Sequence, residues 1–253
     1  LYLNFMNIKI NFKNRAFNKP NGNLVLFVDE KFNISGLKKL ISNSEYSYIL
    51  DLLKSEDIKK KILFFDISSK RKIILISFKK NVTNSEAENL GAKCFDLFNK
   101  LKKNQYIVNS DSLSSNMKNL VGYFLHGIKL KSYKFEKYKT KKDNRSISIN
   151  VVGKNIPNTE NQNKFNALEE GTFYTRDLVS EPGNVLHPDE YAKRIKSLSK
   201  LGLKINIYND QKLKKLGMNT LLGVGQGSIR GSYLVTIEWN GLKNKSRPLA
   251  FVG

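Results

Sequence analysis

Short apolar runs alternate with longer amphipathic stretches along the first half of the chain. The runs are rich in β-branched and aromatic residues, which favour strands. They lie at 7–12, 23–30, 61–67, 72–78, 106–110 and 146–152. Apolar residues at helical spacing between them predict helices within 35–54, 83–101 and 117–128. Strands separated by helices predict an α/β fold with a largely parallel sheet that is covered on both faces.

The helix predicted at 83–101 begins with a capping box, in which Thr83 pairs with Glu86. The only cysteine of the chain, Cys94, lies on the apolar stripe of this helix. We therefore interpret Cys94 as a small core residue and not as a nucleophile. A single cysteine also excludes a disulfide framework and favours a reducing compartment.

The helix predicted at 117–128 has the clearest apolar face in the chain, and His126 lies among its apolar residues. No second histidine, cysteine or acidic residue follows His126 at the i+4 position, where a helical metal site would need one. We interpret His126 as a structural or partly exposed histidine and not as a metal ligand.

A change of composition marks a domain boundary in the middle of the chain. The polar stretch 134–145 is typical of an exposed connection, and 153–163 has the composition of a linker. We predict an N-terminal domain at 6–152, a linker at 153–165 and a second domain at 166–253.

The second part opens with a helix predicted around 165–180, which Pro182 and Gly183 end. His187 and Pro188 restart a helix with proline at its first position and two carboxylates in its first turn. Tyr191, Ile195 and Leu198 are expected to face inward, and Gly202 to end the helix. A strand at 203–208 and a short helix at 209–218 are expected to follow.

The segment Gly223–Ser228 is rich in glycine and resembles a phosphate-binding loop. A dinucleotide fingerprint must open a helix, however, whereas residues 231–239 alternate like a strand. The lysine of a P-loop is absent as well. We therefore predict a glycine-rich strand or turn without phosphate-binding function, and a further buried strand at 248–252.

The chain is strongly basic, with 44 Lys and Arg against 22 Asp and Glu and a net charge of +22. Such an excess favours polyanion partners, because Lys and Arg release counterions from phosphates. The basic residues are nevertheless spread along the chain, with local runs only at 59–61 and 139–142. This spread favours a compositional bias, so specific nucleic-acid binding is not expected.

No stretch is long enough to cross a bilayer, and residues 1–17 lack the apolar core of a secretory signal. Together with the single cysteine, these observations predict a cytoplasmic protein that does not bind membranes.

Three segments in the second part, in this order and at these distances, carry a family resemblance. They are "RDLVSEPGNVLHPDEYA" from Arg176, "LGMNTLLGVGQGS" from Leu216 and "YLVTIEWNG…RPLAFVG" from Tyr233. They resemble the leucyl aminopeptidase (cytosol aminopeptidase) family of dinuclear metallopeptidases. The segment 126–142 resembles the end of that family's N-terminal domain, a three-layer α/β fold related to macro domains. Gly183 departs from the family's usual residue within a turn.

The resemblance implies an enzyme that removes N-terminal residues, often leucine, from peptides, with two divalent cations, Mn or Zn, in a homo-hexamer. In the family, the metal ligands, a catalytic arginine and a bicarbonate site all follow the position that matches Gly253. We therefore expect no catalytic, metal-binding or cofactor-binding residue in this chain, which would be an inactive piece with only the incomplete start of the catalytic domain.

Four acidic residues of the resembling segment do not match the family's ligand positions. We interpret Asp177, Glu181, Asp189 and Glu190 as cap, turn and surface residues.

Two other classes of function stay open at this point. One is a non-catalytic module that binds nucleotides or nucleic acid through the macro-like domain. That domain lacks an evident glycine-rich phosphate loop, since Gly91, Gly122 and Gly127 are isolated and lie on predicted helices. The other is a structural arm for oligomerisation, which the family's hexamers allow.

Overall fold

The computed structural model describes residues 7–13, 22–113, 117, 119–143, 145–242 and 247–253. The chain divides into two compact units, Leu1–Asp177 and Leu178–Gly253. The domain limits predicted from the sequence, with a linker at 153–165, remain a prediction.

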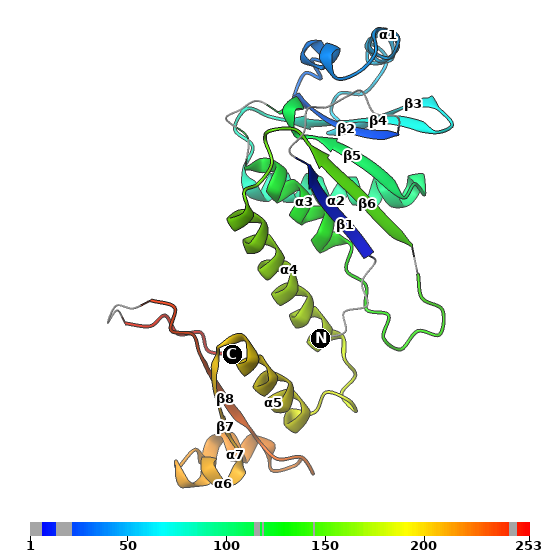
Figure 1. Cartoon of the computed structure of the whole chain (residues 1–253). Coiled ribbons are helices and arrows are strands. Elements are labelled where there is room, and N and C mark those ends of the chain that lie inside the picture. The colour runs from blue at the N-terminus through cyan, green and yellow to red at the C-terminus, as the bar shows by residue number, and fades with distance from the viewer. Residues whose placement is uncertain (1–6, 14–21, 114–116, 118, 144, 243–246) are drawn as a thin grey trace. The chain divides into compact units, whose positions relative to one another are not determined.

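Unit 1 is built on a six-stranded sheet in the order β1-β6-β5-β2-β4-β3 (Figure 1). Its parallel strands are β1 (Asn7–Lys13), β6 (Ser146–Val152), β5 (Gln105–Asn109), β2 (Asn23–Asp29) and β4 (Arg71–Phe78). The edge strand β3 (Ile62–Ser68) is antiparallel to β4, because a tight turn joins the two. The predicted parallel sheet is confirmed, with this hairpin as its exception.

Helices α2 (Asn84–Leu101) and α3 (Leu120–Lys131) cover one face of the sheet. They bury a large apolar cluster because their apolar stripes face the β-branched side chains of the strands. The cluster includes Val25, Phe27, Ile74, Ile76, Cys94, Phe98, Tyr106, Phe124 and Ile149. Burial raises the pKa of the Cys94 thiol, which confirms Cys94 as a core residue.

The other face carries the 3-10 helix η1 (Ser35–Lys39) and α1 (Asn43–Leu52). Their apolar side chains form a second cluster with the opposite side of the strands. Glu45 in the first turn of α1 contacts Arg71 at the start of β4, so this helix is also tied to the sheet by an ion pair. The predicted arrangement of helices on both faces of a sheet is confirmed.

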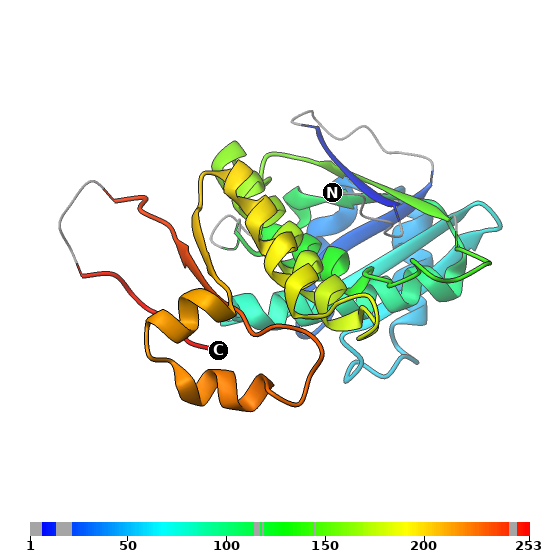
Figure 2. The ribbon, with the colours of Figure 1, turned by 90° about the horizontal axis from the view of Figure 1, so that it is seen from below.

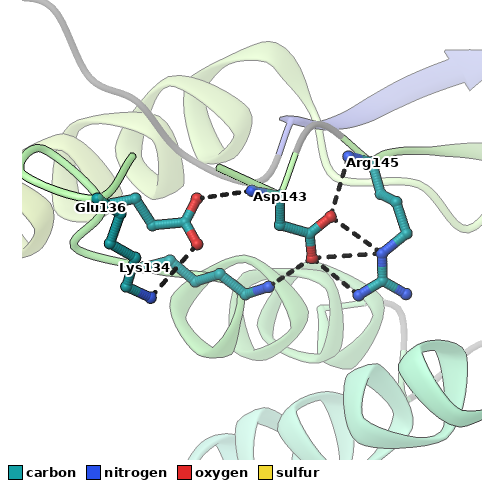
Figure 3. Close-up of polar contacts among 5 residues, drawn as sticks. Lys134, Glu136, Asp143 and Arg145 are labelled. Carbon is teal, nitrogen blue, oxygen red and sulfur yellow. Dashed lines mark hydrogen bonds and ion pairs between the residues drawn. The ribbon is translucent and has the colours of Figure 1, made fainter. Parts of the chain in front are cut away.

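The connection between α3 and β6 folds back on itself through a cluster of charges (Figure 3). Asp143 accepts from Lys134 Nζ at 2.8 Å and from Arg145 Nη2 at 2.8 Å. Its backbone amide donates to Glu136 Oε2 at 3.2 Å. The hydrogen bonds from Arg145 and Lys134 hold the pKa of Asp143 well below its usual range. The predicted exposed connection is therefore ordered by its own ion pairs.

Helix α4 (Thr159–Ser180) runs alongside α3 and begins within the segment predicted as a linker. The Phe165 ring lies 5.0 Å from the ring of Tyr123 on α3, and Phe173 is buried against Tyr133 with ring centroids 5.4 Å apart. A Cβ on Gly122 would lie only 2.4 Å from the Phe165 ring, so this glycine permits the close approach.

Unit 2 contains a two-stranded sheet and short helical segments (Figure 2). Strand β7 (Lys204–Tyr208) pairs antiparallel with β8 (Leu234–Glu238). The helical segments are α5 (Pro188–Ser197), η4 (Leu198–Leu201), α6 (Asp210–Lys215) and α7 (Asn219–Gly225). Gly202 follows η4 with a φ of +88°, which confirms the predicted helix end.

Three local predictions for this unit are wrong in whole or in part. Gly223 and Gly225 lie in helix α7, whereas Gly227 lies in a turn as predicted, and the strand begins only at Leu234. Residues 247–253 form no strand, since none of the described strands pairs with them and a strand exists only through pairing. Tyr191 was expected to face inward, but its position on α5 leaves it 45% exposed.

Candidate functional site

The segment 176–192 supplies the charged residues that the sequence singles out, and Arg194 organises two of them. Arg194 Nη1 donates to Glu181 at 2.9 Å and Arg194 Nε donates to Glu190 at 3.0 Å. The turn after Glu181, in which the amides of Val185 and Leu186 donate to the Pro182 carbonyl, brings the two carboxylates together.

Glu181 lies at a turn, which is one of the roles expected for these acidic residues, but its side chain is only 2% exposed. The hydrogen bond from Arg194 holds the pKa of Glu190 below its usual range. Both carboxylates are therefore committed to one guanidinium, which fixes the turn at the start of α5.

His187 acts as the N-cap of α5, as its position before Pro188 predicts. Its Nδ1 accepts from the Glu190 amide at 3.4 Å and also contacts Asp189. The other oxygen of Asp189 lies 3.3 Å from Arg230 Nη1. These contacts close the first turn of the helix and give both His187 and Asp189 a structural role there.

Asp177, in unit 1, serves to attach α4 to the end of α3. Tyr133 donates its hydroxyl to Asp177 Oδ1 at 2.8 Å, and the neighbouring Arg176 donates to the Leu130 carbonyl at 2.6 Å. The four acidic residues are thus hydrogen-bonded or paired with groups of the chain itself.

These residues do not fit a two-metal site. Within the described ranges, no three His, Cys, Asp or Glu side chains come together as a metal site would require. A carboxylate such as Glu181, already held by Arg194, would have to give up its partner to bind a cation.

The glycine-rich segment offers no phosphate cradle either. Its first three residues end the short helix α7, and turns follow. A Cβ on Gly225 would lie 2.0 Å from Ser232 Oγ, so this glycine serves a close packing contact.

A crevice of about 450 Å³ opens at the carboxyl ends of β2, β4 and β5 in unit 1. The connections after β2 and β5 leave in opposite directions there, which is where open α/β sheets bind ligands. Asp29 and Glu30 line it together with Lys31 and Lys80. Because both signs of charge are present, the crevice has no evident preference for phosphates.

The structure agrees with the interpretation of His126 as a structural residue, but the sequence did not reveal its partner. It is 7% exposed, and its Nδ1 lies 2.7 Å from Glu88 Oε1 on α2. Glu88 precedes His126 by 38 positions, so no local spacing could reveal the pair. The ring also lines a smaller cavity between α3 and α4.

Among the helices of the described ranges, none combines the length and apolar character that a bilayer crossing requires.

The charged segment 176–192 lies within a region that is similar to a known family. The model of the cytosol aminopeptidase family's catalytic domain matches residues 173–253. A probable cytosol aminopeptidase of Chelativorans sp. is 45% identical over 133 residues, which are 50% of this chain and 27% of that protein. The one of Phytoplasma mali is 44% identical over 138 residues, which are 51% of this chain and 28% of that protein.

Solved structures show the same fold. A tomato leucine aminopeptidase mutant matches with a TM-score of 0.75 and 19% identity, over 92% of this chain and 51% of that chain. The bottromycin maturation enzyme BotP in complex with Mn matches with a TM-score of 0.66 and 15% identity, over 87% and 46%. The chain spans about a quarter of the length of the curated relatives and about half of these structures.

Proposed function

We propose that the whole protein is a metal-dependent aminopeptidase, because residues 173–253 match the catalytic domain of the cytosol aminopeptidase family. The family resemblance predicted from the sequence is confirmed. The match at 173–253 is the observation that carries the proposal. We propose leucine as the preferred N-terminal residue of its peptide substrates.

The proposed cofactors are two divalent cations, Mn or Zn, held by residues of the whole protein outside those described. Such ions polarise a scissile carbonyl and lower the pKa of a bound water. The family match and the Mn complex of BotP support this choice. The four acidic residues at 177, 181, 189 and 190 already pair with other side chains of this chain, so we do not propose them as metal ligands.

The residues of this chain contribute a scaffold to the proposed enzyme. Arg194 fixes the turn between Glu181 and α5, and the β7–β8 pair provides the first strands of the catalytic domain. We further propose a cytoplasmic homo-hexamer. The names of the curated relatives support the compartment.

The test compares the whole protein with residues 1–253. The whole protein is expected to hydrolyse a chromogenic leucine amide, to lose this activity on chelation and to regain it with Mn²⁺ or Zn²⁺. Residues 1–253 with the same metals are expected to stay at the metal-only background. Turnover by residues 1–253 would mean that the active site is misplaced. An inactive whole protein, across several aminoacyl amides and both metals, would contradict the peptidase proposal.

A further inference from the structure

Unit 1 contains a cavity of about 180 Å³ that the proposed peptidase activity does not use. It lies between β1, α3 and α4, and Ile10, Phe12, Leu125 and Phe165 form its apolar wall. A cavity of about 150 Å³ holds a benzene molecule, so this space is large enough for a branched aliphatic side chain.

His126 is one of the polar residues that line the cavity. Glu88 on α2 holds the Nδ1 edge of the imidazole, and the Phe165 ring of α4 lies 5.2 Å from the imidazole ring. His126 Nε2 is buried without a hydrogen-bond partner among the described residues. This nitrogen has no surface open to the cavity, so His126 serves as a reporter of binding and not as a hydrogen-bond partner of a ligand.

Two opposite charges complete the wall next to this ring. Lys129 Nζ of α3 lies 3.0 Å from Glu169 Oε1 of α4, and the two side chains are 23% and 15% exposed. A free α-amino acid carries an ammonium and a carboxylate at a similar separation, so it can pair with both side chains at once.

We propose that this cavity binds a free α-amino acid with an aliphatic side chain. The side chain occupies the apolar wall, the carboxylate pairs with Lys129 and the ammonium pairs with Glu169. The inference does not depend on the proposed peptidase activity, because it concerns binding to unit 1.

The test uses proton NMR of residues 1–253 with leucine as the probe. The chain has two histidines, so the His187 ring in unit 2 serves as an internal reference for the His126 ring. Leucine is expected to shift the His126 signal in a saturable way and to leave the His187 signal in place. Isoamylamine and 4-methylpentanoate, which carry one charge each, are expected to bind about tenfold more weakly or worse.

Variants of the two charged residues test whether leucine is recognised by its charges or merely fills the cavity. Lys129→Met and Glu169→Gln are each expected to weaken leucine binding about tenfold. Lys131→Met is the matched control, since Lys131 is on the same helix, does not line the cavity and pairs only loosely with Asp96 at 3.6 Å. The proposal is overturned if leucine leaves the His126 signal unchanged up to its solubility limit, if the single-charge analogues bind equally well, or if all three variants behave alike.

Discussion

The two carboxylates that pair with Arg194 lie at different distances from it along the sequence. Glu190 lies one helical turn before it, a spacing that is visible in the sequence. Glu181 reaches Arg194 only because the turn at Pro182 reverses the chain, and the sequence predicts the break but not the direction in which it turns. Contacts such as Glu181–Arg194, which depend on how the chain turns, therefore cannot be predicted from the sequence.

Replacing Arg194 with methionine is expected to destabilise the start of α5 by about 2–4 kcal/mol, because the buried Glu181 carboxylate loses a charged partner. Hydrogen exchange of the α5 amides measures the effect. Lys193→Met is the control. Lys193 is 82% exposed and lies 3.8 Å from Glu190, so a change below about 0.5 kcal/mol is expected. Equal effects of the two substitutions would show that Arg194 contributes only surface charge.

Glu86 is expected to cause part of the loss of stability at acidic pH. Hydrogen bonds from Lys79 and from Thr83 in the capping box lower the pKa of Glu86 from 4.5 to about 2. A carboxyl with a depressed folded pKa contributes stability above its unfolded pKa and loses it as the pH falls. The contribution of Glu86 is therefore expected to disappear between pH 4.5 and about 2.

The measurement is acid unfolding followed by circular dichroism. Glu86→Gln is expected to flatten the decline of stability over that pH interval and to lower stability at neutral pH. An unchanged slope would contradict the assigned pKa.

At the scale of elements, α2 and α3 depend on glycine for their contact. A Cβ on Gly127 would lie 1.9 Å from the carbonyl oxygen of Glu88, and one on Gly91 would lie 1.9 Å from that of Phe124. The sequence shows these glycines as isolated positions on helices, where glycine is unfavourable. Only the packed structure gives the reason for them, because it places one helix backbone against the other.

Gly127→Ala is expected to destabilise unit 1 by about 1–3 kcal/mol or more, since a rigid backbone must move to admit the methyl group. Gly171→Ala in α4 is the matched control, because nothing lies within 4 Å of its added Cβ. That substitution is expected to stabilise the helix by about 0.5–1 kcal/mol. Urea unfolding of both variants distinguishes the two signs, and a stabilising Gly127→Ala would contradict the close helix contact.

Elements with a strong periodic pattern were predicted well, as α2 and the parallel strands show. The failures, Gly223–Gly225 and 247–253, lie where a short apolar run carries no information about its partner. The candidate cavity also escaped prediction, because lining residues such as Phe12, His126 and Glu169 come from three separate elements, β1, α3 and α4.

At the scale of the whole molecule, the net charge is +22, but the basic residues are spread along the sequence and do not cluster in one segment. We expect residues 1–253 to bind DNA weakly and without sequence preference. The affinity should fall steeply between low and physiological salt, as purely phosphate-driven binding does. Titration of two unrelated duplexes at several salt concentrations measures both properties. Submicromolar, sequence-selective binding at physiological salt would instead favour a nucleic-acid-binding module.

The pairing of β1 with β6 also has a consequence for synthesis on the ribosome. Asn7–Lys13 is made before the other described strands, yet its partner among them is the distant Ser146–Val152. At about 5–20 residues per second, the nascent strand waits on the order of ten seconds before that partner is translated. During this interval its apolar residues, such as Ile8 and Ile10, are available to chaperones, whereas β3 and β4 can pair as soon as they emerge.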